Sequence, residues 1–245
     1  MLVNLFVPCL VETAVPEVGE ATARVLSRAG CTVTVPPGQT CCGQPVYKTG
    51  NLAQARQLAA RYVELFDSGT VVSPSGSCVA MVRRYPELLA FEPALAAKAR
   101  DLAERTYELS DFLVNVLGTT DLGAAMNARA AYHDSCQVGR VLGLRDEPRA
   151  LLGAVRGLTV LELDRPDACC GFGGAFSVQF PDASERILQD KILDILAQTP
   201  DIVVSAEVSC LLNIRAGLEH AGSRVRALHL AQVLDHGMDA REVSR

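Results

Sequence analysis

Short apolar stretches alternate with longer amphipathic ones along the first third of the chain. Residues 2–8 are an apolar run of strand length, and the β-branched residues at 32–35 and 70–73 predict two further strands. Residues 16–30 have proline at the front, apolar residues at helical spacing and glycine behind, which predicts a helix. Residues 51–66 show the same helical spacing. Strands that alternate with helices predict a parallel sheet with crossover helices.

The second half of the chain has the same order of elements. Its predicted strands and its long predicted helix lie at residues 129–134, 158–163, 201–206 and 183–198. Residues 86–128 predict helices that join the halves, with a loose linker at their end. We therefore expect an α/β fold of two pseudo-repeated Rossmann-like modules with parallel sheets. The first module is residues 1–125, with the connecting helices, and the second is residues 126–245.

The cysteines follow the same repeat. With Cys31 set aside, they form a first quartet and a second quartet, which are Cys9, Cys41, Cys42 and Cys78, and Cys136, Cys169, Cys170 and Cys210. The first gap is 32 residues in one quartet (9 to 41) and 33 residues in the other (136 to 169). Cysteines placed at random in a core would not keep this register. The repeat therefore indicates two similar modules, each of ordinary domain length.

Every cysteine of the two quartets comes just after a predicted strand. Ligands of parallel α/β folds bind beyond the carboxyl ends of the strands. We therefore expect three cysteine loops in each half to bring four thiols to the carboxyl edge of its sheet. Cys31 has no counterpart in the second half, so we expect it to be a small buried apolar residue.

Four thiols in each half are compatible with three kinds of chemistry. Adjacent cysteines make a poor disulfide, because their Cα atoms are only about 3.8 Å apart. Zinc accepts four thiolates, but structural zinc sites use short hooks such as C-x-x-C, which this chain lacks. Iron–sulfur clusters are held mainly by cysteine and spread their ligands more widely. The pattern favours iron–sulfur clusters, and loops braced by zinc or disulfides remain the alternative.

Glycines follow each cysteine pair, where they let the backbone approach a sulfur closely and aim N–H groups at it. Four of them are candidates to contact a cluster, in addition to forming turns: Gly43, Gly171, Gly173 and Gly174. His133 lies three residues before Cys136, and is either a hydrogen-bonded structural histidine or a donor to the cluster. We expect His229, at the start of a final helix, to be structural.

Composition narrows the class of protein. Of the 245 residues 49% are hydrophobic, the net charge is −5, and no apolar run reaches the roughly 18–20 residues of a membrane span. The start of the chain has no secretory signal, so we expect a cytoplasmic protein whose thiols stay reduced. The acidic charge argues against nucleic-acid binding. No G-x-G-x-x-G follows the first strand, so no NAD site is expected.

These motifs together resemble a known family. The doubled pattern C-x(n)-C-C-G-x(n)-C includes QTCCGQP at 39–45, YHDSC at 132–136 and ACCGFGG at 168–174. It resembles the cysteine-rich CCG domain that heterodisulfide reductase shares with the iron–sulfur subunit of glycolate oxidase. Within that family the chain is most similar to the branch of lactate-utilisation protein A, over essentially its whole length.

The resemblance implies an iron–sulfur electron-transfer subunit of a complex that oxidises L-lactate to pyruvate, an oxidoreductase subunit that is not active alone. Its partners would be the other subunits of that complex, including a ferredoxin-like iron–sulfur protein. Two related functions stay open. One is a thiol–disulfide reductase subunit like that of heterodisulfide reductase, and the other is the iron–sulfur subunit of an oxidase of glycolate or another 2-hydroxy acid.

The sequence also departs from the wider family. In the CCG-domain subunit of heterodisulfide reductase each repeat ends in C-x-x-C, and five cysteines hold a non-cubane cluster. Here Ser75 and Glu207 stand three residues before Cys78 and Cys210. Four cysteines in each half suit one ordinary 4Fe–4S cluster per module, although the Glu207 carboxylate could supply an oxygen ligand. The departure argues against disulfide-cleaving chemistry.

Overall fold

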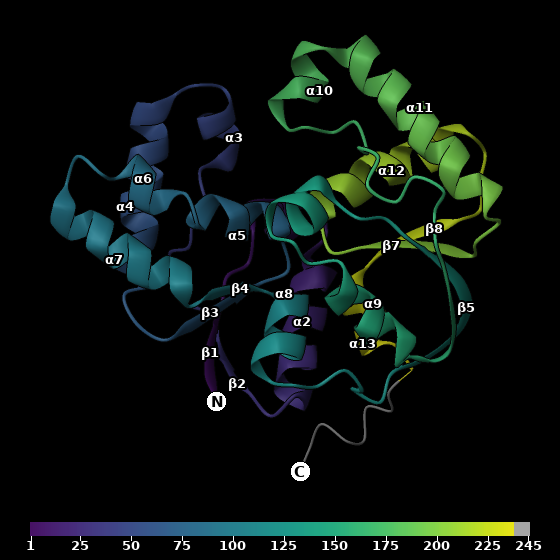
Figure 1. Cartoon of the computed structure of the whole chain (residues 1–245), viewed down its shortest axis with the longest axis horizontal. Coiled ribbons are helices and arrows are strands. Elements are labelled where there is room, and N and C mark those ends of the chain that lie inside the picture. The colour runs from purple at the N-terminus through teal and green to yellow at the C-terminus, as the bar shows by residue number, and fades with distance from the viewer. Residues whose placement is uncertain (238–245) are drawn as a thin grey trace.

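Two four-stranded sheets, one in each half of the chain, form the framework of the protein. The computed structural model describes residues 1–237. The first sheet has the strand order β2-β1-β3-β4, and all its neighbouring strands are parallel (Figure 1). Its strands are β1 (Leu2–Leu5), β2 (Thr32–Thr34), β3 (Thr70–Ser73) and β4 (Thr106–Glu108). Crossover helices link these strands, as expected for a parallel sheet.

Helices α2 (Pro16–Arg28) and α4 (Leu52–Leu65) lie where the sequence predicts helices, at residues 16–30 and 51–66. The long helix α4 is capped at its start by Asn51, whose side chain accepts a hydrogen bond from the Gln54 N–H. Proline stands in the first turn of α2, where it needs no hydrogen-bond partner. The helices of this half are α1 (Cys9–Ala14), α2 (Pro16–Arg28), α3 (Gln44–Lys48), α4 (Leu52–Leu65), α5 (Gly76–Val82), α6 (Tyr85–Leu88), α7 (Pro93–Glu104) and α8 (Leu109–Asp111), followed by the π-helical turn η1 (Phe112–Val116).

The second half repeats the first in its sheet. The strand order is β6-β5-β7-β8, again parallel throughout. Its strands are β5 (Ala125–Tyr132), β6 (Arg156–Leu161), β7 (Ile202–Ser205) and β8 (Arg226–His229). Its helices are the π-helical turn η2 (Cys136–Val141), α9 (Asp146–Gly153), α10 (Ala175–Gln179), α11 (Pro181–Ala197), α12 (Val208–His220) and α13 (Leu230–Asp235). The fold is therefore the predicted pair of Rossmann-like modules.

Two strands differ from the sequence-based expectation. The sequence predicts helices and a loose linker for residues 86–128, but this segment also contains β4 and the first residues of β5. β8 likewise completes the second sheet where the sequence predicts no strand. Both β4 and β8 are edge strands of only three and four residues. β2 is equally short, but its sequence TVT is rich in β-branched residues, whereas β4 (TYE) has one β-branched residue and β8 (RALH) has none, so neither shows a strand signal.

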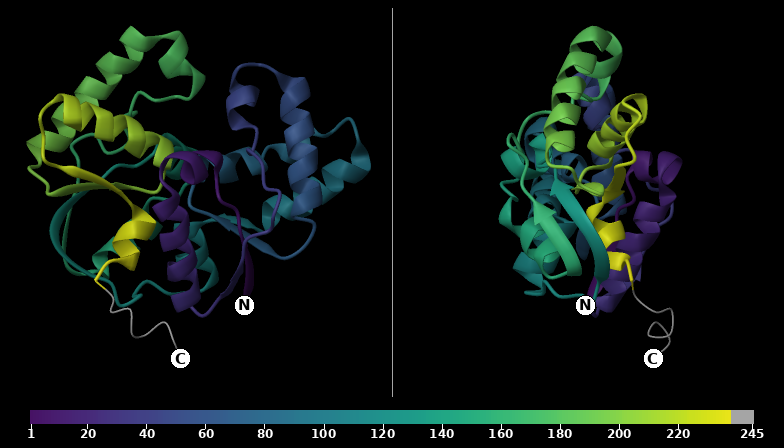
Figure 2. Two further views of the ribbon diagram at one scale, coloured as in Figure 1. Left: turned by 180° about the vertical axis from the view of Figure 1, so that it is seen from behind. Right: turned by 90° about the vertical axis from the view of Figure 1, so that its right-hand side faces the viewer.

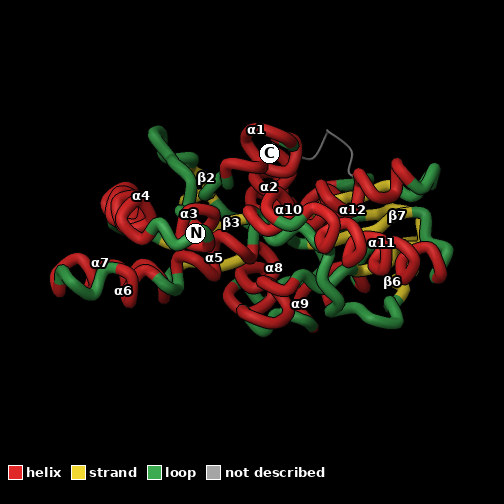
Figure 3. The backbone as a smooth tube through the Cα atoms, turned by 90° about the horizontal axis from the view of Figure 1, so that it is seen from above, coloured by secondary structure: helices red, strands yellow, loops and turns green. Residues whose placement is uncertain are grey.

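The two halves share one hydrophobic core. The largest cluster of buried residues includes Val25 of α2 and Val72 of the first sheet together with Tyr132 and Leu234 of the second half. Figure 2 shows α2, drawn in purple, beside the yellow α13, and the contacts between these helices are extensive. Seen from above, α8 and α9 lie together at the junction on the side opposite α2 (Figure 3). The division into residues 1–125 and 126–245 stays a prediction.

Between residues 1 and 237, the structure contains no helix with both the length and the apolar character that crossing a membrane requires.

One close contact between the halves is formed where α5 meets η2. A Cβ atom at Gly76 would overlap with the Cγ2 atom of Val138 and would lie 3.3 Å from its Cα atom. Gly76 is buried, and Val138 is fully buried in the shared core. The missing side chain of Gly76 therefore allows α5 to pack closely against η2.

We expect Gly76→Ala to lower the free energy of unfolding by about 1–3 kcal/mol, because the added methyl group overpacks this contact. Chemical denaturation of the two proteins measures the difference. Gly153→Ala is the matched control, since Gly153 is also helical and a Cβ there meets no atom within 4 Å. Equal losses of stability in both variants would contradict this account of the contact.

Candidate metal centre

The first quartet gathers at the carboxyl edge of the first sheet. Cys9 is the first residue of α1, which follows β1, and Cys78 lies in the first turn of α5, which follows β3. Cys41 and Cys42 occupy the loop between β2 and α3. Each loop leaves the carboxyl end of a parallel strand, as the sequence predicts. The sheet thus brings together four thiols that are up to 69 positions apart in the sequence (9 to 78).

The sulfur atoms of the first quartet are near neighbours. The Sγ atoms of Cys9 and Cys41 lie 3.7 Å apart, and the Gly43 N–H donates to the Cys41 sulfur at 3.4 Å. Hydrogen bonds from Cys42 and Cys9 lower the pKa of Cys41 to about 3. Hydrogen bonds to Cys41 and Cys78, together with burial, raise the pKa of Cys42. Hydrogen bonds therefore connect the four sulfurs in the order Cys9, Cys41, Cys42 and Cys78.

The second quartet has the same placement on the second sheet. Cys136 begins η2 after β5, and Cys210 lies in the first turn of α12 after β7. Cys169 and Cys170 lie in the loop between β6 and α10. The sulfurs of Cys170 and Cys210 are 3.0 Å apart, and the Gly171 N–H donates to the Cys169 sulfur at 3.3 Å.

Electrostatics connects the rest of the second quartet. A hydrogen bond to Cys170, followed by burial, raises the pKa of Cys169. The pKa of Cys210 is lowered by its hydrogen bond with Cys170, but burial and the charges of Glu207, Cys136 and Cys169 raise it overall. Cys210 is therefore influenced by each of the other three thiols of the second quartet.

The exposure of the cysteines follows one rule in both quartets. The second member of each pair and the last cysteine are buried, whereas the remaining cysteines are partly or fully accessible. Cys169 is the most accessible, as it is exposed to solvent. Cys31 is buried in the shared core, as expected for an apolar residue, and belongs to neither site. All nine cysteines are free thiols.

The glycine after each cysteine pair has a left-handed backbone. Gly43 has φ +85° and Gly171 has φ +87°. A Cβ atom at Gly171 would lie 2.5 Å from the Ser184 carbonyl oxygen, so this position excludes any side chain. Gly173 and Gly174 lie at the end of the same loop, directly before α10. The glycine that follows each pair thus supplies the N–H group on the sulfur of the first cysteine.

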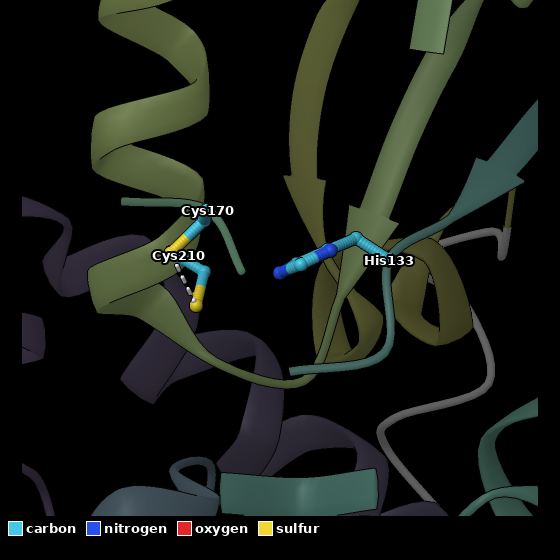
Figure 4. A group of neighbouring side chains, drawn as sticks. All are labelled: His133, Cys170 and Cys210. Carbon is cyan, nitrogen blue, oxygen red and sulfur yellow. Dashed lines mark hydrogen bonds between the residues drawn. The ribbon is translucent and has the colours of Figure 1, made fainter. Parts of the chain in front are cut away.

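His133 lies inside the second site. Its side chain is fully buried, and neither ring nitrogen has a hydrogen-bond partner within residues 1–237. A ring nitrogen and the sulfurs of Cys170 and Cys210 all lie within 4.8 Å of one another, a group able to hold a metal ion, and the imidazole points toward the two thiols (Figure 4). Burial lowers the pKa of His133 to about 3, so the ring is neutral near pH 7.

Glu207 has a different neighbourhood from the one the sequence suggests. Its buried carboxylate accepts hydrogen bonds across the junction of the halves, from the Ser77 N–H at 2.8 Å and the Ser75 hydroxyl at 3.2 Å. It also accepts from the Ser209 hydroxyl at 3.0 Å. Glu207 thus links the start of α12, with Cys210, to the start of α5, which carries the last cysteine of the first quartet.

Two residues without a sequence signal hold the cysteine pairs in place. The Tyr85 hydroxyl donates to the Cys42 carbonyl at 2.7 Å, and the Asn213 amide donates to the Cys170 carbonyl at 2.8 Å. The two anchors occupy different positions of the repeat, seven residues after Cys78 in one half (78 to 85) and three after the last cysteine in the other (210 to 213). The repeat therefore could not reveal them.

His229 is structural, as predicted. It is fully buried and caps α13, with its Nδ1 atom accepting a hydrogen bond from the Ala231 N–H at 3.1 Å. Burial lowers the pKa of His229 to about 4.

We expect Glu207→Ala to lower the free energy of unfolding by about 1–3 kcal/mol, because it leaves the buried Ser77 N–H without its acceptor. Glu219→Ala is the control on the same helix, where an exposed side chain is expected to matter by no more than about 0.5 kcal/mol. Thermal or chemical denaturation of the metal-free proteins separates the two. A Glu207→Ala protein as stable as the control would show that the hydrogen bonds of Glu207 to Ser75 and Ser77 do not contribute to stability.

Comparison with known proteins identifies relatives of the whole chain. The sequence model of the family described as "CCG: Cysteine-rich domain" matches residues 3–83 and 130–215, which are the two halves that carry the quartets. "Lactate utilization protein A" of Bacillus subtilis (strain 168) is 45% identical over 236 residues, covering 96% of this chain and 99% of that protein. The protein of the same name from Geobacillus kaustophilus (strain HTA426) is 43% identical over the same shares of both chains.

A solved structure with the same fold is more distant. The crystal structure of a hypothetical protein from Helicobacter pylori superposes with a TM-score of 0.60 at 9% sequence identity. The match covers 98% of this chain, which spans 50% of the length of that one. At this identity the similarity shows a shared fold.

Proposed function

This chain belongs to the cysteine-rich CCG-domain family, and from that premise we propose that each cysteine quartet holds one 4Fe–4S cluster in an electron-transfer subunit of a lactate-oxidising complex. The observation that carries the proposal is the convergence of thiols in both halves, with sulfur–sulfur distances of 3.7 Å in the first site and 3.0 Å in the second. The name of the relatives supplies the metabolic context.

The donor set of each site fits an iron–sulfur cluster. Four sulfurs at a carboxyl edge match the cysteine-only ligand set of these clusters, whose ligands come from loops far apart in sequence. Backbone N–H groups already donate to one sulfur in each site, from Gly43 and Gly171. Such hydrogen bonds stabilise the negative charge on a cluster's sulfur atoms and help to set its potential. The flanking Gly173 and Gly174 keep side chains away from the second site.

Zinc and disulfides fit the sites less well. The thiols of each half come from three separate loops without any C-x-x-C hook, whereas structural zinc sites are built on such hooks. The adjacent pairs are too close for ordinary disulfide geometry. A disulfide between the two members of a pair would also bend the loop that Tyr85 or Asn213 holds in place.

In each site, one side of the cluster would be shielded from water and the other side would be open to solvent. Cys42 and Cys78 are buried in the first site, and Cys170 and Cys210 in the second, so bulk water is kept from that side. When bound, a cluster in each half supplies reversible one-electron storage. Oxidation of L-lactate to pyruvate releases two electrons and two protons, and two one-electron centres in one chain match that number of electrons.

The chain's role within the complex follows from what its own residues provide. Its sites supply thiols and N–H donors, so lactate binding and the first oxidation step belong to other subunits. We assign it partners among the other subunits of that complex, including a ferredoxin-like iron–sulfur protein, and a place in the cytoplasm, where thiols stay reduced. Electron-transfer partners commonly meet over small interfaces, so the complex is expected to be separable.

We expect anaerobic reconstitution with iron and sulfide to load two clusters per chain. Cys41→Ala and Cys169→Ala each remove one thiol from one quartet, and each variant should lose about half of the iron and sulfide. Cys31→Ala is the control, because Cys31 is buried in the core outside both sites. Iron and sulfide analysis with visible absorption spectra gives the measurement.

Two results would contradict the proposal. One is stoichiometric zinc with almost no iron after anaerobic purification. The other is an unchanged iron content in both the Cys41→Ala and the Cys169→Ala proteins, which would place the iron away from the quartets.

A further inference from the structure

His133 and Phe6 occupy equivalent positions in the two halves. Each lies three residues before the first cysteine of its quartet. The Phe6 N–H donates to the Val72 carbonyl at 2.9 Å, and the His133 N–H donates to the Val204 carbonyl at 2.9 Å. Both side chains are fully buried. The repeat therefore places an aromatic hydrocarbon in the first half where the second half has an imidazole.

The environments of the two rings differ. Phe6 packs edge-on against Tyr62 at 4.8 Å and Phe66 at 6.0 Å between ring centroids, as an apolar core residue should. His133 instead points at the sulfurs of Cys170 and Cys210 (Figure 4). The buried polar side chain of His133 therefore faces the thiols, whereas Phe6 at the equivalent position packs into the apolar core.

The polar groups around His133 already have partners of their own. Lys191 and Asp194 are the charged groups whose fields reach the imidazole. They form a buried ion pair at 3.0 Å, and Lys191 also donates to the Arg165 carbonyl at 2.6 Å. A buried polar atom without a hydrogen-bond partner is destabilising, so the unpartnered ring nitrogens of His133 need a reason. The neighbouring sulfurs are the acceptors that remain.

We propose that a ring N–H of His133 donates a hydrogen bond to a sulfur of the centre held by Cys170 and Cys210, which makes the second centre easier to reduce than the first. The inference rests on the proposed function of the quartets. Reduction adds negative charge to a cluster and its thiolates, and a hydrogen-bond donor stabilises that charge. Phe6 offers no such donor to the first centre.

The difference in potential between the two centres gives electron transfer within the chain a direction, from the first centre to the second. Both centres receive one backbone N–H, from Gly43 and from Gly171, and only the second has an imidazole as well. At equilibrium an electron therefore resides on the second centre. Cys169, the exposed thiol of that quartet, gives this centre a solvent-accessible side.

The test is a reduction titration of the reconstituted protein, followed by electron paramagnetic resonance. The wild type should show two midpoint potentials. His133→Phe gives the second site the ring of the first, and should lower the higher potential by about 59 mV, which is a tenfold change in the reduction equilibrium of a one-electron couple. Phe6→Leu is the matched control in the first half and should leave the higher potential unchanged. Iron and sulfide content should stay at two clusters in both variants.

A second measurement needs no variant. In wild-type protein labelled with ¹⁵N-histidine, pulsed electron paramagnetic resonance should detect a weakly coupled histidine nitrogen at one of the two centres. Strong coupling, which means direct coordination to iron, would overturn the hydrogen bond. So would two fully loaded centres with the same potentials in the wild type and in His133→Phe. Failure to load any iron is a different outcome, because it overturns the proposed function itself.

Discussion

Four thiols held side by side in a partly buried space cannot all carry charge at once. In the first quartet the pKa of Cys41 is lowered to about 3, while hydrogen bonding to that sulfur raises the pKa of Cys9, and hydrogen bonds and burial raise the pKa of Cys42. These effects favour the thiolate form of Cys41 and the protonated forms of Cys9 and Cys42. A metal centre resolves the same conflict differently, because its positive charge lets every ligand lose its proton. The rest of the fold serves to keep these thiols together.

The parallel sheets and their junction maintain that arrangement. Strands β1, β2 and β3 end at one edge and release three loops, and the second sheet does the same. Gly76 lets α5 approach η2, and Glu207 ties α12 to α5. Helices α5 and α12, which carry the last cysteine of each quartet, are thus joined at their N-terminal ends. Movement of one half therefore displaces cysteines in both sites.

The sequence predicts the parts of this structure that repeat. The quartets, their position after the strands and the paired modules follow from the register of Cys9 and Cys136 within their halves. The edge strands β4 and β8 do not follow, because TYE and RALH lack the β-branched runs that mark the equally short β2 and β3. Cross-half contacts such as Glu207 with Ser77 are also invisible in one dimension. The unpartnered state of His133 depends on what surrounds it in space, so YHDSC alone could not distinguish a structural histidine from a donor.

Above all, we propose that each cysteine quartet binds one iron–sulfur cluster. Crystals grown anaerobically from reconstituted protein, with anomalous diffraction measured on both sides of the iron absorption edge, test it most directly. We predict two separate iron peaks per chain, one among Cys9, Cys41, Cys42 and Cys78 and one at the corresponding place in the second half. Anomalous peaks at the zinc edge alone, or iron bound away from these sulfurs, would contradict it.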